Sequence, residues 1–237
     1  ILNGLSLVKK KIESIRLVTS GAGAAAISCL RLLEILGLEL NNIILTDKYG
    51  IVNSTREDLD VGKKRYARSI NFKNLEEAIK NADVFLGLSV GNKLNKKMLK
   101  SLAKEPLILA LANPVPEVNP DIVKAVRPDA IIATGRSDYP NQVNNVLCFP
   151  FIFRGAIDVG ATIINDEMKL ACVYALAKLA RFEPSDIVNK AYNEESAGFG
   201  KNYIIPKPFD PRLLVHLAPA VARAAIISGV ATRPIRN

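Results

Sequence analysis

The sequence has one histidine, His216, and only three cysteines, Cys29, Cys148 and Cys172. A single histidine excludes a multi-histidine metal site, and the cysteine spacing fits neither a disulfide framework nor a zinc knuckle. No apolar run reaches the roughly 18 residues of a membrane span. Glycine and proline, at 14 and 13 of 237 residues, are too few for a disordered or collagen-like chain. We therefore expect a globular protein in a reducing, cytoplasmic compartment, with no membrane partner.

The sequence is also short of acidic residues. Lysine and arginine number 32 against 23 acids, which gives a net charge of +9, and residues 1–105 carry 18 of the bases and 11 of the acids. A solvated basic face is one explanation, and attraction of anionic small molecules, above all phosphates, is another. The basic clusters lack interleaved aromatic residues and any nucleic-acid-binding motif, so we expect no nucleic-acid partner.

Apolar segments of strand length alternate with helical patterns over the first 135 residues. Strands are predicted at residues 15–20, 42–47, 83–88, 106–111 and 129–135, with helices between them. Their continuous apolar runs indicate strands that are covered on both faces. Further helices are predicted at residues 167–180 and after Asp210, where Asp210 is the expected N-cap and Pro211 the first helical residue. The sequence therefore predicts an α/β fold: a Rossmann-like, doubly wound, mostly parallel sheet with helices on both faces and C-terminal helices.

The first predicted strand is followed by the motif Gly21-x-Gly23-x-x-Ala26, which opens a helix. Gly21 permits a tight turn, Gly23 lets the backbone approach a pyrophosphate, and Ala26 lets helix and strand pack closely. The free amides of a helix N-terminus favour a bound anion. The motif predicts a dinucleotide site, and a tight turn without a ligand is the alternative. The predicted cofactor-binding residues of this loop are Ser20, Gly21, Ala22, Gly23, Ala24 and Ala25.

Asp47 ends the second predicted strand about two dozen residues after the glycine motif, where an acid commonly binds the adenosine ribose. Taken alone it favours NAD, because a carboxylate repels the 2′-phosphate of NADP. Lys48 is adjacent, and Arg56, Lys63 and Lys64 follow, so a basic pocket for that phosphate is the alternative. These residues leave the choice of coenzyme open.

Six longer strings resemble the NAD(P)-binding domain of malic enzymes, particularly the large bacterial type. They are Val18–Ala26, Leu111–Pro114, Ala133–Asp138, Gln142–Pro150, Phe153–Ala156 and Tyr203–Asp210. The resemblance implies that residues 1–237 form the NAD(P)-binding domain of an NADP-dependent malate dehydrogenase (oxaloacetate-decarboxylating). Members oxidise L-malate with NADP or NAD, release pyruvate and CO2, and use Mg²⁺ or Mn²⁺. The resemblance favours NADP and implies a homo-oligomer.

The resemblance also implies roles for single residues. The loop from Ser20 to Ala25 would hold the pyrophosphate, and Asp47 with Lys48 the adenosine end of the coenzyme. Asn113 would lie near nicotinamide and substrate, while Asn144 and Asn145 would reach the nicotinamide ribose and a malate carboxylate. Side-chain amides suit such work because they donate and accept without adding charge. Without the resemblance, Asn113 would be interpreted as part of a turn, and Asn144 with Asn145 as a helix cap.

In the family, the acid–base tyrosine and lysine and the metal-binding carboxylates precede the matching segment. We therefore expect no catalytic and no metal-ligating residue in this chain, and coenzyme binding without turnover of malate. We also expect a parent polypeptide that continues beyond both ends, with a phosphate acetyltransferase-like domain downstream in the long members. Two alternatives stay open: a non-catalytic nucleotide-sensing module, and the cofactor domain of an amino-acid dehydrogenase.

Overall fold

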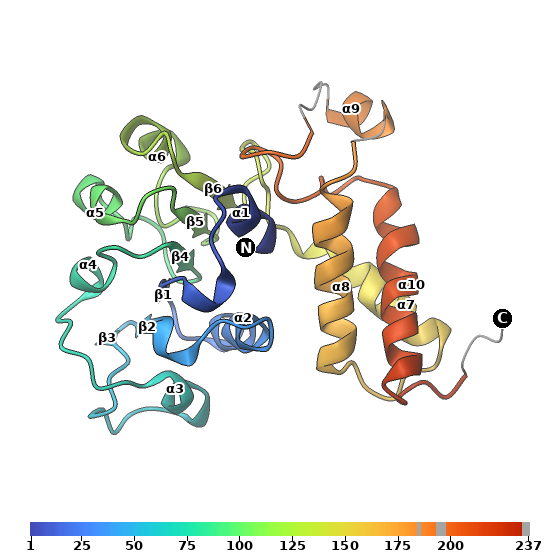
Figure 1. Cartoon of the computed structure of the whole chain (residues 1–237), viewed down its shortest axis with the longest axis horizontal. Helices are drawn as coiled ribbons and strands as arrows, with labels where there is room; N and C mark the ends of the chain where they lie inside the picture. The colour runs from blue at the N-terminus through green and yellow to red at the C-terminus, as the bar shows by residue number, and fades with distance from the viewer. Residues whose placement is uncertain (184–185, 193–197, 234–237) are drawn as a thin grey trace. The chain divides into compact units, whose positions relative to one another are not determined.

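A six-stranded sheet in the order β3-β2-β1-β4-β5-β6 organises the first part of the chain (Figure 1). The computed structural model describes residues 1–183, 186–192 and 198–233. The chain divides into two units, Ile1–Pro140 and Asn141–Asn237, and the sheet belongs to the first.

The parallel strands of this sheet are buried almost throughout. Only Asp47, the last residue of β2, is partly exposed, and Leu17 of β1 aligns with Ile43 of β2 and Val84 of β4. The burial confirms the prediction of strands covered on both faces. The short edge strand β3 (Gly50–Ile51) pairs antiparallel with β2. The bounds of the parallel strands are Leu17–Ser20 (β1), Ile43–Asp47 (β2), Val84–Gly87 (β4), Leu107–Ala110 (β5) and Ile131–Thr134 (β6).

The chain winds in both directions from β1, which confirms the doubly wound fold. β2 lies on one side of β1 and β4 on the other, and right-handed crossovers then place the connecting helices on opposite faces. Helices α1 and α2 cover one face, and α4, α5 and α6 cover the other (Figure 1). The loops after β1 and β4 consequently diverge at the carboxyl edge of the sheet, where such folds bind ligands. The helices of this unit are α1 (Leu2–Leu7), η1 (Ile12–Ser14), α2 (Ala24–Ile35), η2 (Leu40–Asn42), α3 (Val61–Tyr66), α4 (Leu75–Ala78), α5 (Lys96–Ser101) and α6 (Pro120–Val126).

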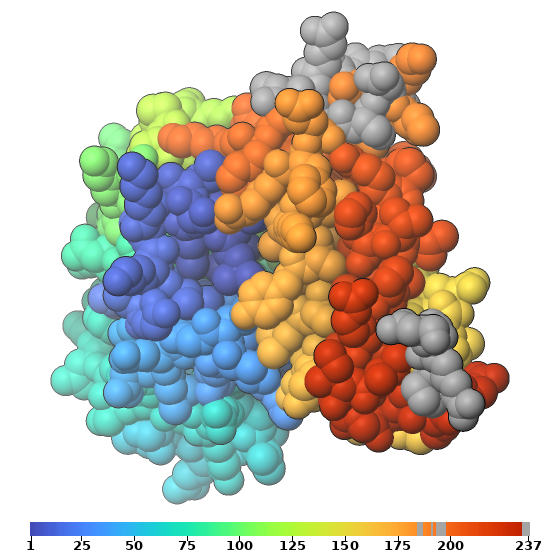
Figure 2. Space-filling model, turned by 45° about the vertical axis from the view of Figure 1, so that its right-hand side comes forward, coloured from blue at the N-terminus to red at the C-terminus, as the bar shows by residue number. Residues whose placement is uncertain are grey.

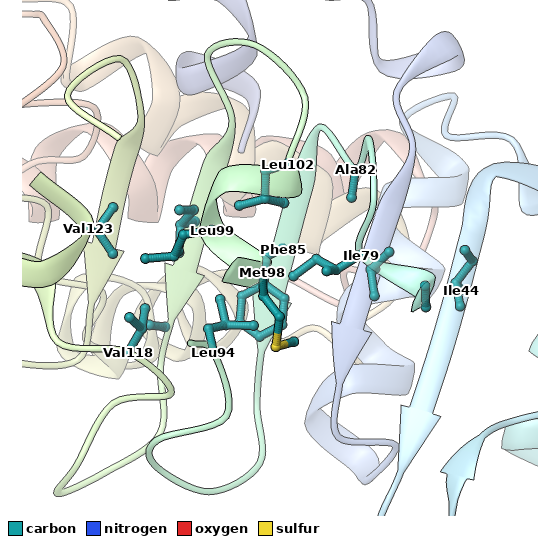
Figure 3. Packing of buried hydrophobic residues seen from close by; sticks show 14 of the residues in the cluster. Ile44, Ile79, Ala82, Phe85, Leu94, Met98, Leu99, Leu102, Val118 and Val123 are labelled. Carbon is teal, nitrogen blue, oxygen red and sulfur yellow. The ribbon is translucent and has the colours of Figure 1, made fainter. Parts of the chain in front are cut away.

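One apolar cluster closes the face beneath α4, α5 and α6 (Figure 3). Phe85 of β4 lies at its centre, with Met98 and Leu99 of α5 packed over the sheet. Phe85 and Leu99 are both fully buried, and each such side chain contributes about 1.5–3 kcal/mol by leaving water. This packing fixes the strands whose ends carry the candidate site.

The second unit is built from helices. α10 packs against both α7 and α8, and the three lie side by side (Figures 1 and 2). α10 begins at Arg212, so the prediction that Pro211 is its first residue was wrong by one position; Asp210 accepts the backbone N–H of Arg212 at 3.0 Å. No helix among the described residues is long and apolar enough to cross a membrane. The helices are η3 (Asn145–Leu147), α7 (Phe149–Asp158), α8 (Asp166–Leu179), α9 (Asp186–Tyr192) and α10 (Arg212–Ile227).

Candidate functional site

The loop between β1 and α2 is held in one conformation by hydrogen bonds from three directions. Gly21 donates its N–H to the Thr46 carbonyl at 2.9 Å, and the Thr19 hydroxyl donates to the Gly21 carbonyl at 2.8 Å. Leu88, just after β4, donates its N–H to the Ser20 carbonyl at 2.8 Å. Gly21 has φ +109°, and a Cβ there would lie 2.4 Å from the Leu88 carbonyl oxygen. The position therefore requires glycine, for its backbone and for the close neighbouring strand.

The first turn of α2 faces open space. Its N-cap, Gly23, is extended (φ −82°, ψ −177°) and makes no side-chain cap hydrogen bond. A Cβ at Gly23 would meet no atom within 4 Å, and Ala24 and Ala25 are exposed while Ala22 is buried. The positive end of this 12-residue helix has no side-chain cap, and backbone amides in that position favour an anion. The loop therefore fits a dinucleotide pyrophosphate.

A buried carboxylate that the sequence did not point to lies at the carboxyl ends of β4 and β5. Glu117 is fully buried; its Oε1 accepts the N–H of Ser89 and its Oε2 the N–H of Ala112, both at 3.0 Å. Ser89 in turn lies with its hydroxyl 2.8 Å from that of Ser20. A Cβ at Gly87 would lie 2.4 Å from the Glu117 carboxyl carbon. Glu117 thus connects the loops after β4 and β5 with the end of β1.

Asn113 lies in the loop after β5, at the same carboxyl edge. It is exposed, and its peptide bond to Pro114 is cis. A Cβ at Gly135 would lie 2.9 Å from both amide atoms of Asn113, so the glycine after β6 makes room for this side chain. The structure therefore brings Asn113 to the sheet edge that carries the glycine loop, with its neighbour Ala112 held by Glu117.

Asp47 is already engaged by cations. Both of its oxygens accept from the Arg56 guanidinium at 2.9 Å, Oδ1 also accepts the N–H of Tyr49, and the Lys63 ammonium is 3.7 Å away. Partial burial alone would raise the pKa of the Asp47 carboxyl, but the Arg56 hydrogen bonds, the Tyr49 N–H and the charges of Arg56 and Lys63 together lower that pKa. Asp47 is therefore a charged anchor for Arg56 and Lys63.

Lys48 lies over the Tyr49 ring, whereas Arg56 and Lys63 pair with Asp47. Its ammonium lies 4.7 Å from the centre of the exposed Tyr49 ring, which the Arg56 guanidinium also approaches at 5.6 Å. The interaction with Tyr49 raises the pKa of Lys48. The end of β2 thus presents cationic side chains around one carboxylate. This arrangement matches the predicted basic pocket more closely than a lone ribose-binding acid.

Asn144 and Asn145 belong to the second unit, where both are exposed. Asn144 is the N-cap of η3, and its Oδ1 accepts the N–H of Val146 at 3.0 Å. The helix-cap interpretation of Asn144 therefore holds. The cap uses the amide oxygen of Asn144.

The acidic and sulfur-bearing side chains of the described residues are not grouped as metal ligands would be. Within the ranges that the structure describes, no group of three or more histidine, cysteine, aspartate or glutamate residues could hold a metal ion. These residues do not fit the Mg²⁺ or Mn²⁺ that the family resemblance implies.

Comparison with known proteins gives one consistent similarity. A family model described as "Malic enzyme, NAD binding domain" matches residues 1–187. The NADP-dependent malic enzyme of Haemophilus influenzae is 61% identical over 239 residues, which cover 100% of this chain and 32% of that protein. The NAD-dependent malic enzyme of Rhizobium meliloti is 55% identical over 238 residues, which cover 100% of this chain and 31% of that protein.

A solved structure agrees with these relatives. The crystal structure of the Entamoeba histolytica malic enzyme is 36% identical and has a TM-score of 0.84, covering 97% of this chain and 46% of that one. The chain spans about a third of the length of the curated relatives described here.

Proposed function

This chain belongs to the malic enzyme family, and we propose that it is the dinucleotide-binding part of an enzyme that oxidises L-malate and decarboxylates it to pyruvate and CO2. The observation that carries the proposal is the uncapped start of α2, with Gly23 facing open space beside the fixed turn at Gly21. That arrangement supports binding of the coenzyme pyrophosphate by the residues from Ser20 to Ala25.

The nicotinamide end is proposed to lie at the loop after β5, which carries Asn113. When bound, the nicotinamide ring would accept a hydride from C2 of malate. Asn113 would orient the ring and the substrate, Asn144 would bind the nicotinamide ribose, and Asn145 would bind a malate carboxylate. The exposed side chains of all three support these roles. Neutral amides fix distance and orientation without adding a charge beside the reacting carbon.

The relatives include an NADP-dependent and an NAD-dependent enzyme. The two coenzymes differ by the 2′-phosphate, so the residues at the adenosine end determine which one binds. We propose NADP for this chain. The support is the pairing of Asp47 with Arg56 and Lys63, which offsets the negative charge that would repel a 2′-phosphate. Asp47 would then hold Arg56 in place, with Lys48 at the rim of the same pocket.

The remaining parts of the reaction are proposed to lie outside these 237 residues. They are the Mg²⁺ or Mn²⁺ site and the tyrosine and lysine that move protons; the support is that this chain covers only 32% of the length of the Haemophilus influenzae relative. We also propose a homo-oligomer in a reducing cytoplasm. The support for a reducing location is that three cysteines at these spacings fit no disulfide framework.

Calorimetric titration of the 237-residue chain with NADPH and with NADH tests the proposal. We expect binding of both, tighter for NADPH, and no pyruvate from malate with this chain alone. Absence of binding at millimolar coenzyme would overturn the site, and pyruvate formation would overturn the division of labour. A longer polypeptide that contains this chain and matches its relatives in length should reduce NADP with malate. Binding without that reduction would indicate a nucleotide-sensing module instead.

A further inference from the structure

Two cysteines that are far apart in sequence meet in the second unit. The sulfur atoms of Cys148 and Cys172 lie 3.2 Å apart across 24 positions of sequence. Cys148 is the N-cap of α7, and Cys172 lies in the middle of α8. A disulfide bond is about 2.05 Å long, so closing the pair requires a movement of only about 1 Å.

The two thiols are not equivalent. Cys148 is half-buried, whereas Cys172 is 2% exposed. The hydrogen bond from Cys172 lowers the pKa of the Cys148 thiol, and the same pairing with burial raises the pKa of Cys172. Cys148 also stands at the positive end of α7, which favours a thiolate. A half-buried thiol with a lowered pKa beside a buried thiol is the arrangement that favours redox sensitivity.

We propose that Cys148 and Cys172 are a reversible disulfide-forming site, oxidised by small-molecule disulfides of the glutathione type. The Cys148 thiolate attacks one sulfur of the small disulfide, forms a mixed disulfide and releases one small thiolate. Cys172 then loses its proton and attacks the Cys148 sulfur, releasing the second small thiolate. The two protein thiols are oxidised by two electrons, and one small disulfide is reduced to two thiols.

The bond would join segments that already share one apolar cluster. Cys172 is a member of that cluster, and Cys148 packs against it. The N–H of Cys148 donates to the Asn145 carbonyl at 3.1 Å, so the bond would also tether the turn that carries Asn144 and Asn145. An effect on coenzyme binding rests on the proposed function, whereas formation of the bond does not.

The third cysteine provides a matched control. Cys29, in α2, is half-buried, and burial raises the pKa of its thiol. It belongs to the first unit, and the Cys148–Cys172 pair to the second. Cys29→Ala should therefore leave disulfide formation unchanged.

The test is incubation of the 237-residue chain with oxidised glutathione, followed by alkylation in denaturant and peptide mass mapping. We expect a Cys148–Cys172 linked peptide in the parent chain and in Cys29→Ala, reversed by reduced glutathione. Cys172→Ala should instead keep a stable glutathione adduct on Cys148. Adducts without the linked peptide in the parent chain, or faster reaction at Cys29 than at Cys148, would overturn the proposal.

Thermal unfolding gives a second readout that does not depend on coenzyme. The bond closes a loop in the unfolded chain, so the oxidised protein should unfold at a higher temperature than the reduced one. Cys148→Ala should unfold at the same temperature with or without oxidised glutathione, and its circular dichroism should confirm that it is folded. If the linked peptide forms in a chain that binds no coenzyme, the disulfide site is confirmed and the proposed function is rejected. Failure of the disulfide proposal and failure of the proposed function are therefore distinguishable.

Discussion

The carboxylate of Glu117 accepts the backbone N–H of Ser89 at 3.0 Å, although the two residues are 28 positions apart and Glu117 is fully buried. The other carboxylate oxygen accepts the N–H of Ala112. Two strand ends of the candidate site therefore depend on one side chain. Because Ser89 contacts Ser20 and Ala112 precedes Asn113, Glu117 connects the proposed pyrophosphate loop with the proposed nicotinamide ligand Asn113.

Glu117→Gln tests this dependence. The amide keeps one acceptor and turns its NH2 group toward the other backbone N–H, so one buried donor is left unsatisfied. We expect a loss of about 1–3 kcal/mol in the free energy of unfolding, measured with denaturant. We also expect NADPH affinity to fall at temperatures where the variant is folded.

Glu76→Gln is the matched control for charge. Glu76 pairs with the exposed Lys97 at 2.7 Å, and an ion pair between exposed side chains contributes little to stability. Equal losses of stability in the two variants would contradict the role given to Glu117. Unchanged NADPH affinity in folded Glu117→Gln would show that the carboxylate stabilises the fold without positioning the loop.

Gly23→Ala should separate coenzyme binding from folding. The backbone at Gly23 suits any residue, and the added methyl group meets no atom within 4 Å. A bound pyrophosphate would have to fill that space, so we expect NADPH affinity to fall at least tenfold, which is about 1.4 kcal/mol. The unfolding temperature should be unchanged or slightly raised.

Gly200→Ala is the control for that variant, since its Cβ would meet no atom nearer than 4.0 Å. It belongs to the second unit and should change neither stability nor affinity. Undiminished binding in Gly23→Ala would reject this loop as the pyrophosphate site.

Gly21→Ala should act in the opposite way, on stability first. The variant combines a positive φ with a clash against the Leu88 carbonyl oxygen at 2.4 Å, and we expect a loss of about 3 kcal/mol or more. Gly37 has the same φ of +109°, but its Cβ would meet nothing nearer than 3.5 Å. Gly37→Ala should therefore cost only the backbone strain, about 1 kcal/mol. Similar losses in the two denaturation curves would contradict the close approach at Leu88.

The sheet and its glycine loop were predictable because local signals determine them. Continuous apolar runs mark buried strands, and the Gly21 and Gly23 pattern between a strand and a helix has a specific backbone requirement. The contacts around the loop were not predictable. A glutamate between proline-rich turns usually lies in solvent, and only Gly87 at the end of β4 hints at a close neighbour for Glu117.

The charge balance at the end of β2 shows the same limit. The sequence predicted that Asp47 ends a strand and that Arg56 follows nearby, but it left open whether the acid or the basic residues determine the choice of coenzyme. The geometry of a short loop determines that Arg56 binds both oxygens of Asp47. Likewise, no local pattern brings Cys148 to Cys172, because separate helices carry them.

Arg56→Ala tests coenzyme preference directly. The variant removes a cation from the proposed 2′-phosphate pocket and leaves Asp47 with Lys63 as its remaining cation. We expect NADPH affinity to fall about tenfold, or about 1.4 kcal/mol, and NADH affinity to stay constant or improve. The measurement is a pair of titrations for each protein.

Arg65→Ala is a suitable control for that experiment, because Arg65 pairs with Glu34 at 2.6 Å and not with Asp47. It should weaken neither coenzyme selectively. If Arg56→Ala loses affinity for NADPH and NADH equally, Arg56 stabilises the loop but does not bind the 2′-phosphate.

Acid sensitivity should depend in part on Asp129. Its carboxylate accepts from Arg127 at 2.8 Å and from the N–H of Glu105 at 2.8 Å, and these hydrogen bonds hold the pKa of Asp129 well below its usual range. Arg127 also donates to the carbonyls of Leu99 and Ala103 at the end of α5. The charged form of Asp129 thus stabilises a junction of the first unit.

The direction of the pH dependence of stability follows from the lowered pKa of Asp129 in the folded state. Stabilisation is complete above the unfolded pKa of about 3.9 and is lost as pH falls below it toward the folded value. Asp129→Asn should cost about 1–2 kcal/mol at pH 7, and the difference from the parent chain should shrink as the pH falls to about 3. Denaturant unfolding at several pH values checks this, and a difference that stays constant with pH would show that the Asp129 charge does not stabilise the fold.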